Sequence, residues 1–210
     1  SEGQSVTCTI TNDDIAPKLR IIKNVIIDDG GKALPNDFKL TVGGKPVTSG
    51  TSSILKANQT YAINETLLRG YNFVDITGNP KCPSVLGGTI MLDEGDNITC
   101  TITNNDIAPT IKVVKKVVND NGGNAIVDDF EIKIGTGLLS FGSGVVNNYT
   151  TTYSTDILKV KSNISYYLSE LDLSGYDEGD WVCADNDYPE NIVTNPVLLD
   201  PGQNVTCTVV

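Results

Sequence analysis

One stretch of this sequence occurs twice almost unchanged, and that repetition constrains the fold more than any other feature. The first copy is SVTCTITNDDIAPKLRIIKNVIIDDGG from Ser5, and the second is NITCTITNNDIAPTIKVVKKVVNDNGG from Asn97. A shortened third copy, NVTCTVV, occupies positions 204–210. The copies recur at intervals of about 100 residues, a spacing typical of tandem domains.

This repeat frame predicts the domain organisation. Residues 15–106 form a first complete domain and residues 107–210 a second. Residues 1–14 match the last strand of the repeat, but the first complete domain already contains its own copy of that strand. We therefore expect residues 1–14 to complete a preceding or neighbouring domain. Two arrangements are open: a segment of a longer tandem chain, which we favour, or a strand donated to an adjacent subunit by β-strand addition. The first ten residues lack signal-peptide features, so we expect a mature chain or a piece of a longer one.

Within each repeat, short alternating segments rich in Val, Ile, Thr and Tyr end at turn signals such as DDGG, GNP and DPG. No window has the sustained apolar spacing of a long helix. We therefore predict an all-β protein with tandem immunoglobulin-like β-sandwich domains. Proline in the Ile107-Ala108-Pro109 junction predicts a short, stiff linker.

Composition narrows the possible functions. With 15 Lys and Arg against 26 Asp and Glu, the net charge is −11, so nucleic acids and anionic lipid surfaces are not expected partners. No apolar run is long enough for membrane insertion. The sequence has no His, the residue most used in acid-base catalysis and in metal binding, so we expect no enzyme activity, cofactor or metal. The acidic loops, such as Asp28-Asp29 and Asp128-Asp129, lack EF-hand spacing, and we interpret them as turn residues.

The five cysteines form no CxxC pair, which favours structural disulfides in an oxidising compartment over a zinc or redox site. Each complete repeat has one cysteine after a Gly-Tyr landmark and one in its last strand. This placement predicts the pairs Cys82–Cys100 and Cys183–Cys207, with buried free thiols as the alternative. Cys8 is left over, and we expect its partner in another domain or subunit.

Three polar positions recur on the predicted core face of the strands, because residues two apart in a strand share a face. Lys23 shares a face with Leu19 and Ile21, and Lys115 occupies the same place in the second repeat. A carboxylate recurs likewise at Glu65 and Glu170. An asparagine follows on the core face of the last strand, at Asn12 and Asn104. Buried unpaired charges are costly, so these groups need a joint explanation.

This order of residues resembles the CnaB or SpaA-type prealbumin-like domains of microbial surface adhesins and pili, over nearly the whole chain. The resemblance implies a prealbumin-like sandwich in which a lysine attacks an asparagine carboxamide while a glutamate shuttles protons, forming an isopeptide bond. Lys23 would be the nucleophile, Glu65 the shuttle and Asn104 the acceptor, and burial supplies the pKa shifts that the reaction needs.

In the second domain the resemblance assigns Lys115 and Glu170 to the same roles. Val210 stands one residue before the acceptor position, and Asn12 of a neighbouring domain could supply the acceptor. The alternative for both domains is a hydrogen-bonded Lys–Glu pair or a lysine whose ammonium reaches the domain edge.

Six N-x-S/T sequons indicate a secreted glycoprotein, and they begin at Asn58, Asn64, Asn97, Asn148, Asn163 and Asn204. Asn97 and Asn204 occupy equivalent positions just before the last strand of each repeat, which makes them the best candidates.

These patterns together predict a structural repeat of an extracellular, cell-surface filament, pilus or adhesin stalk. Its partners would be copies of itself or flanking repeats joined end to end. The alternative is an extracellular module that binds a carbohydrate or a host protein. The extra residues between Gly137 and Thr155, with Phe141, Tyr149 and Tyr153, are the feature that favours this alternative.

Overall fold

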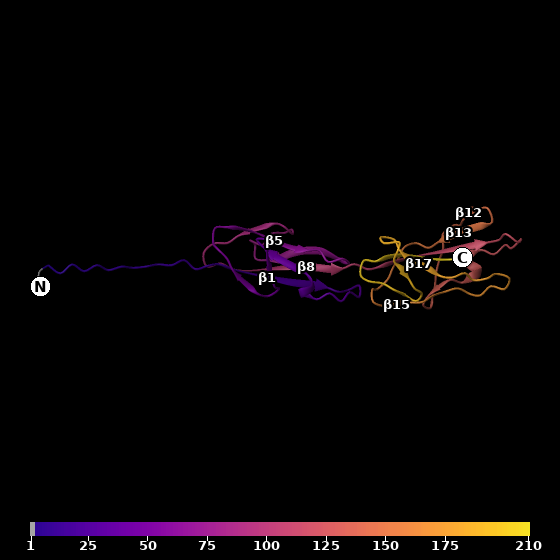
Figure 1. The fold of residues 1–210 in the computed structure, drawn as a ribbon, viewed down its shortest axis with the longest axis horizontal. Helices are drawn as coiled ribbons and strands as arrows, with labels where there is room; N and C mark the ends of the chain where they lie inside the picture. The colour runs from indigo at the N-terminus through magenta and orange to yellow at the C-terminus, as the bar shows by residue number, and fades with distance from the viewer. Residues whose placement is uncertain (1–2) are drawn as a thin grey trace. The chain divides into compact units, whose positions relative to one another are not determined.

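The structure, a computed structural model, describes residues 3–210, which divide into two compact units. The second unit comprises residues 104–210 together with the short segments 25–33 and 68–72. Strands make up nearly all of the regular structure, and the described helical residues are two short 3-10 turns. The predicted all-β class with tandem sandwich domains is therefore confirmed (Figure 1).

The first eight strands form two four-stranded sheets. One sheet has the order β4-β1-β8-β6 and the other the order β3-β2-β5-β7. The elements of this domain are β1 (Lys18–Ile26), η1 (Pro35–Asp37), β2 (Lys39–Val42), β3 (Lys45–Val47), β4 (Ser52–Ile54), β5 (Thr60–Thr66), β6 (Tyr71–Gly78), β7 (Thr89–Met91) and β8 (Asn97–Asp106).

Alternation along the strands builds the core of this domain. In β1 the side chains of Leu19 and Ile21 are buried while those of Lys18 and Arg20 are exposed. β8 repeats the pattern with buried Ile98, Cys100 and Ile102. A strand that is polar on one face and apolar on the other stabilises a sheet that packs on one side only. The remaining buried apolar side chains include Leu40, Val42, Ile63, Ile90 and Leu92.

The second domain has one large sheet, with the order β12-β13-β9-β20-β17-β18 and with β14 also paired to β9. The facing strands are shorter and split into the sheets β11-β10-β16 and β15-β19. The elements are β9 (Thr110–Val118), η2 (Val127–Phe130), β10 (Lys133–Ile134), β11 (Gly137–Leu138), β12 (Val145–Asn147), β13 (Thr150–Ser154), β14 (Leu158–Lys159), β15 (Ser165–Tyr166), β16 (Leu168–Ser169), β17 (Val182–Asp185), β18 (Ile192–Val193), β19 (Val197–Leu198) and β20 (Asn204–Val209).

The first and last strands of each domain are neighbours in one sheet. β1 lies beside β8, and β9 lies beside β20. β9 and β20 run parallel, with Cys207 opposite Val113 and Val209 opposite Lys115. In each domain the first and the last strand are therefore held together as one hydrogen-bonded strand pair.

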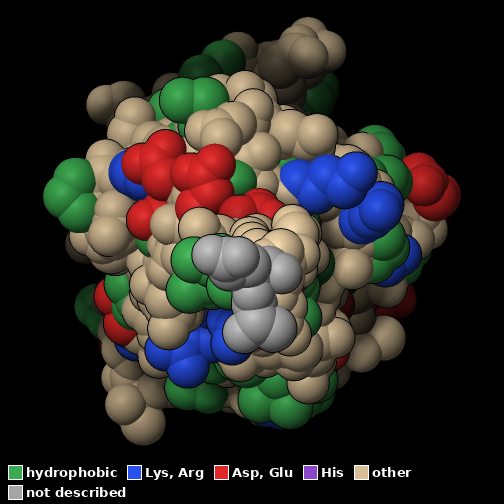
Figure 2. Space-filling view, turned by 90° about the vertical axis from the view of Figure 1, so that its left-hand side faces the viewer, with side chains coloured by type: hydrophobic (Ala, Val, Ile, Leu, Met, Phe, Trp, Pro, Cys, Tyr) green, Lys and Arg blue, Asp and Glu red, His purple; other side chains and the backbone are tan. Residues whose placement is uncertain are grey.

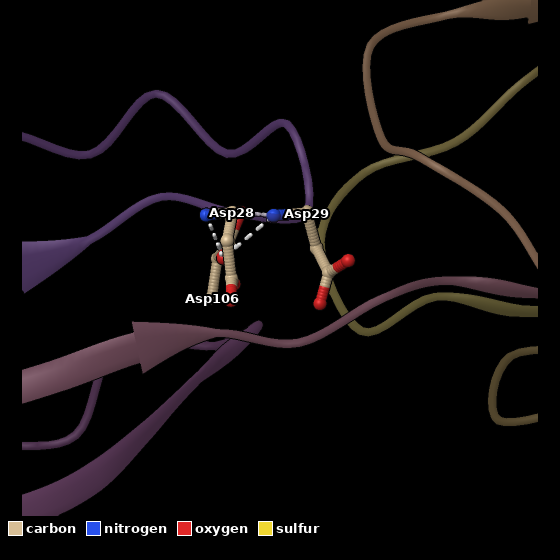
Figure 3. Close-up of side chains that lie close together, drawn as sticks. All are labelled: Asp28, Asp29 and Asp106. Atoms are coloured by element: carbon tan, nitrogen blue, oxygen red, sulfur yellow. Dashed lines mark hydrogen bonds between the residues drawn. The ribbon is translucent and has the colours of Figure 1, made fainter.

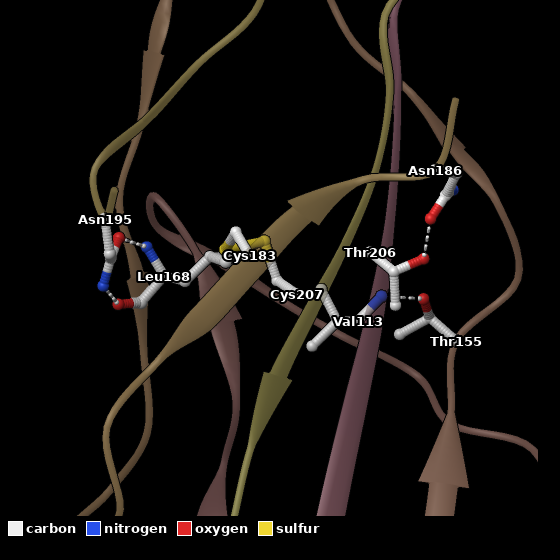
Figure 4. The surroundings of a disulfide bond; sticks show 8 residues. All are labelled: Val113, Thr155, Leu168, Cys183, Asn186, Asn195, Thr206 and Cys207. Carbon is white, nitrogen blue, oxygen red and sulfur yellow. Dashed lines mark hydrogen bonds between the residues drawn. A yellow bond between two sulfur atoms is a disulfide. The ribbon is translucent and has the colours of Figure 1, made fainter. Parts of the chain in front are cut away.

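Two disulfides are present, Cys82–Cys100 and Cys183–Cys207. Cys183 and Cys207 lie directly opposite each other on β17 and β20 (Figure 4). Nearby, the Asn195 side chain accepts a hydrogen bond from the N–H of Leu168 and donates one to the C=O of the same residue. Such satisfied polar contacts allow irregular backbone in the core without a desolvation penalty.

The insertion between Gly137 and Thr155 extends the large sheet. β12 and β13 form a hairpin, and β13 pairs with β9 from Thr150 opposite Val118 to Ser154 opposite Val114. Phe141 and Tyr153 pack against the core of the domain, whereas Tyr149 is exposed near the hairpin turn.

Residues 4–14 form no strand, and their side chains are exposed. Val6 and Ile10 are 76% and 88% exposed, and Cys8 is an exposed free thiol. This segment extends outside the sheets in Figure 1. Among the described residues, none pairs with it as a neighbouring strand, so its place in another domain remains a prediction.

On the face that Figure 2 shows, acidic and basic side chains form separate small groups, and its described residues present no continuous basic surface. None of the helices in the described part of the chain has the length and apolar character that a bilayer crossing requires.

The Cys183–Cys207 disulfide is expected to stabilise the second domain. Because it closes a loop with a sequence separation of 24 residues, replacing both cysteines by alanine should lower the free energy of unfolding by about 2–4 kcal/mol. Urea unfolding followed by the fluorescence of Trp181, the only tryptophan, measures this domain. Cys8→Ala is the matched control and should leave the transition unchanged. Equal stability of the disulfide-free variant and the native protein would contradict the prediction.

Candidate functional site

The first candidate site is an ion pair inside the first domain. Lys23 lies on β1 in one sheet, and Glu65 lies on β5 in the facing sheet. The Lys23 Nζ atom is 2.8 Å from Glu65 Oε2, and neither side chain has exposed surface. The pair therefore spans the core between the two sheets.

The second domain repeats this arrangement. Lys115 lies on β9, and Glu170 directly follows β16. The Lys115 Nζ atom is 2.9 Å from each carboxylate oxygen of Glu170, and both side chains are 2% exposed. All four side chains, which the sequence pattern predicts to face the core, are buried in the structure.

An aromatic ring lies against each lysine. The Lys23 Nζ atom is 4.3 Å from the ring centre of Phe38, and the Lys115 Nζ atom is 4.4 Å from that of Phe130. Both rings are buried. The rings exclude water from the ammonium groups while their π faces stabilise positive charge. Sequence reasoning did not select these phenylalanines, although each follows the repeated Gly-Gly turn at the same distance.

Burial shifts the pKa of one group in each pair, Lys23 in the first domain and Glu170 in the second. It lowers the pKa of the Lys23 ammonium, because loss of water penalises the charged form more than the hydrogen bond to Glu65 stabilises it. Burial likewise raises the pKa of the Glu170 carboxyl, and this outweighs the opposing effect of Lys115. The lowered pKa favours the neutral amine of Lys23, which is the nucleophilic form of lysine, and the raised pKa favours the neutral acid of Glu170.

Asn104, the predicted acceptor of the isopeptide bond, lies on the strand next to the one that carries Lys23. Asn104 is on β8, which neighbours β1, and its side chain is fully buried on the core face. The structure thus brings Lys23 and Glu65 into contact and places Asn104 on the adjacent strand. Asn12, the acceptor expected for a neighbouring domain, is exposed in the N-terminal segment.

A cavity occupies the corresponding region of the second domain. It has a volume of about 590 Å³ and is lined by Lys115, Phe130, Tyr176, Val210 and the loop of residues 117–123. Val209, the last residue of β20, lies opposite Lys115 on β9.

Asp106 is a buried residue that sequence reasoning missed. Its carboxylate accepts hydrogen bonds from the backbone N–H groups of Asp28 and Asp29 at 3.0 Å (Figure 3). It also accepts one from the N–H of Gly31 at 2.7 Å. The carboxylates of Asp28, Asp29 and Asp106 lie close enough to one another to hold a cation. The Asp106 oxygens, however, already face hydrogen-bond donors, so their arrangement fits a loop anchor better than a metal ligand.

The six sequons differ in exposure. The asparagines at positions 58, 64, 97 and 148 are exposed, whereas Asn163 and Asn204 are half-buried. The side-chain carbonyl of Asn204 accepts a hydrogen bond from the Thr110 hydroxyl at 2.8 Å. Asn97 is therefore more accessible than its repeat equivalent Asn204.

Comparison with known proteins identifies the family. Residues 14–102 and 106–209 each match the prealbumin-like fold domain family. The chain belongs to this family. The resemblance to prealbumin-like domains found in the sequence is confirmed, and each match covers one β-sandwich of the structure.

Among solved structures, similar chains include major pilins of Streptococcus pyogenes. One is 13% identical with a TM-score of 0.34, covering 92% of this chain and 98% of the pilin chain. The T3.2 major pilin is 13% identical with a TM-score of 0.34, covering 92% and 97%. The T-13 major pilin is 14% identical with a TM-score of 0.29, covering 93% and 97%. No curated protein matches the chain. The assignment to the prealbumin-like family therefore depends on the sequence match alone.

Removing one partner of a buried pair should destabilise its prealbumin-like domain strongly. Lys115→Met leaves the Glu170 carboxyl buried without its partner and should lower the free energy of unfolding by about 3–5 kcal/mol. The double variant Lys115→Met/Glu170→Leu should recover most of this loss, because apolar residues of similar volume replace both groups.

Urea unfolding followed by Trp181 fluorescence tests this expectation. Lys116→Met alters the neighbouring exposed lysine and is the matched control. A double variant as unstable as Lys115→Met would show that the pair is not the source of the effect.

Proposed function

We propose that this chain is a structural part of an extracellular surface filament, pilus or adhesin stalk, in which covalent bonds tie the strands of each domain. The observation that carries the proposal is the buried Lys–Glu pair, which recurs at the same repeat position in both domains. Each lysine lies on the first strand of its domain, beside the last strand. A pair buried this deeply is poorly explained by stability alone, because desolvation offsets much of the attraction.

The chemistry proposed for the first domain is an isopeptide bond between Lys23 and Asn104. The neutral Lys23 amine attacks the Asn104 carboxamide carbon, forming a new C–N bond. Glu65 transfers a proton from the attacking amine to the leaving amide nitrogen. The bond from the carboxamide carbon to that nitrogen breaks, and ammonia leaves. The reaction needs no other reactant, and the lowered pKa of Lys23 supplies the nucleophile.

The strand arrangement suits a role under load. β9 begins the second domain and β20 ends its described part, and the two strands pair in parallel over six residue pairs. Force applied to opposite ends of such a pair acts along the strands and loads their hydrogen bonds together. A covalent bond between first and last strand would carry that force directly. Tandem domains with such ties would resist both extension and proteolysis.

The same proposal places the chain outside the cell, at the cell surface. Disulfides persist in oxidising compartments, and two are present. Partners would be copies of the chain or flanking repeats joined end to end, with Cys8 bonded in a neighbouring domain or subunit. The exposed sequons at Asn58, Asn64, Asn97 and Asn148 are the better candidates for glycans.

The alternative function, a module binding a carbohydrate or host protein, has weaker support. It depended on the aromatic residues of the insertion, but Phe141 and Tyr153 pack against the core. Tyr149 alone is 68% exposed. A specific glycan-array signal that Tyr149→Ala abolishes would favour the alternative.

Intact-mass measurement and peptide mapping test the proposed isopeptide bond. The native protein should lose the mass of one ammonia, and a branched peptide should join Lys23 to Asn104. Glu65→Ala should prevent this bond because no group then shuttles the protons. Asn105→Ala changes the adjacent residue on β8 and should leave the bond intact. A native protein without the ammonia loss, or a bond that persists in Glu65→Ala, would overturn the proposed chemistry.

A further inference from the structure

In each domain a short segment leads from the Gly-Gly loop to the phenylalanine that lies against the buried lysine. We call these segments the straps, and they comprise residues 31–38 in the first domain and 123–130 in the second. Phe38 directly follows the 3-10 turn η1, and Phe130 is the last residue of η2. In both turns an aspartate carboxylate accepts a hydrogen bond from the backbone N–H three residues earlier. The two straps therefore end in the same local structure.

A tyrosine hydroxyl holds the strap of the second domain. The Tyr176 hydroxyl accepts a hydrogen bond from the N–H of Ala125 at 3.0 Å and donates one to the side-chain carbonyl of Asn119 at 2.6 Å. The Asn119 amide in turn donates to the C=O of Ala125 at 3.1 Å. Both backbone polar groups of Ala125 are thus bonded within this network. Asn119 directly follows β9, the strand that carries Lys115, so the strap is anchored to the lysine's own strand.

The ring of Tyr176 also supports the phenylalanine of the strap. The ring centres of Phe130 and Tyr176 are 5.5 Å apart, and the two rings meet edge to face at 86°. The same Phe130 ring centre lies 4.4 Å from the Lys115 Nζ atom. An edge-to-face contact favours one relative orientation of two rings. The placement of the Phe130 ring against the amine therefore depends on Tyr176.

The first domain has the same tyrosine contact. The Tyr71 hydroxyl accepts hydrogen bonds from the N–H groups of Lys32 at 3.0 Å and Ala33 at 2.9 Å. Ala33 and Ala125 occupy the same place in the two repeats. The chain between strap and tyrosine is longer in the second domain, yet the tyrosine returns to the same backbone position. The contact is therefore a feature of the repeat and not of one loop.

We propose that Tyr71 and Tyr176 are positioning residues for the buried lysines: each hydroxyl holds a strap, and the strap keeps a phenylalanine against the lysine and water away from its amine. Water exclusion matters because a hydrated amine retains its proton more strongly and is then not nucleophilic. In the first domain this inference rests on the isopeptide chemistry proposed for Lys23. At Lys115 it stands without that chemistry.

The ε-methylene protons of Lys115 report where the Phe130 ring lies, because an aromatic ring shifts the NMR resonances of protons over its face. Phe130→Leu removes the ring and gives the reference position. Tyr176→Phe, which removes only the hydroxyl, should move the Lys115 resonances toward that reference. Tyr166→Phe is the matched control, since the Tyr166 hydroxyl also accepts a backbone hydrogen bond, from Lys161 at 2.8 Å. Lower stability alone leaves these resonances in place, so native positions in Tyr176→Phe would overturn the positioning role.

Acylation by a water-soluble active ester measures access to the amine. Lys115 is 2% exposed, and the exposed neighbour Lys116 is the internal reference in the same sample. Tyr176→Phe should raise the acylation rate of Lys115 relative to Lys116 by about fivefold to tenfold, because the loss of one hydrogen bond favours opening of the strap by that factor. The same rate ratio in the variant and the native protein would contradict the proposal.

A second variant displaces the hydroxyl and leaves the tyrosine in place. A Cβ atom on Gly123 would collide with the Tyr176 hydroxyl, and the backbone of Gly123 does not have the positive φ that disfavours alanine. Gly123→Ala should therefore cause both changes expected for Tyr176→Phe. Gly137→Ala is its control, since the added methyl group meets only the C=O of Ile134 at 3.5 Å. Unchanged resonances and acylation in Gly123→Ala would show that the hydroxyl does not hold the strap.

In the first domain the readout is the proposed bond itself. Tyr71→Phe should slow formation of the Lys23–Asn104 bond after refolding by about fivefold to tenfold, measured by intact mass over time. Tyr61→Phe is the control, because the Tyr61 hydroxyl accepts a hydrogen bond from the N–H of Lys56 at 3.0 Å in an exposed loop. Equal rates in Tyr71→Phe and the native protein would refute the role of Tyr71. A native protein without the bond would overturn the proposed chemistry, whereas the Lys115 measurements decide the positioning role separately.

Discussion

The burial of a lysine between two sheets is the constraint on which the rest of this fold depends. An amino group held away from water needs a polar partner, and in both domains the carboxylate that contacts it comes from the facing side of the sandwich. Glu65 and Glu170 meet this need, and Phe38 and Phe130 close the sites against water. The position of each glutamate is thereby fixed relative to the first strand, even in the second domain, where the facing strands are short and split into two sheets.

Much of this arrangement could be predicted from the sequence. The repeat predicts β-sandwich domains in tandem, and the two-residue period of β1 and β9 predicts that Lys23 and Lys115 face the core. The cysteine pairs followed from their place in the repeat frame. These features are local or periodic, so one strand carries enough information to state which way a side chain points.

Other features depended on contacts between distant segments. Asp106 lies at the end of β8, and nothing local shows that its carboxylate binds a loop whose residues are 75 to 78 positions away. The insertion before Thr155 contains aromatic residues typical of a binding loop, yet its strand β13 pairs with β9 and Tyr153 packs inward. Pairing and packing decide these cases, and neither follows from composition.

The disulfides and the lysine sites tie the last strand to different neighbours. In the first sheet β8 lies between β1 and β6, and Cys100 on β8 is bonded to Cys82, which follows β6. Lys23 lies on the other neighbour, β1. The second domain repeats this order, since β20 lies between β17, which carries Cys183, and β9, which carries Lys115. A disulfide therefore cannot replace a bond between the first and last strands, because it leaves their pairing held by hydrogen bonds alone. The presence of both cysteines and buried lysines in each repeat is thus not redundant: the two kinds of tie would join three adjacent strands into one covalent unit.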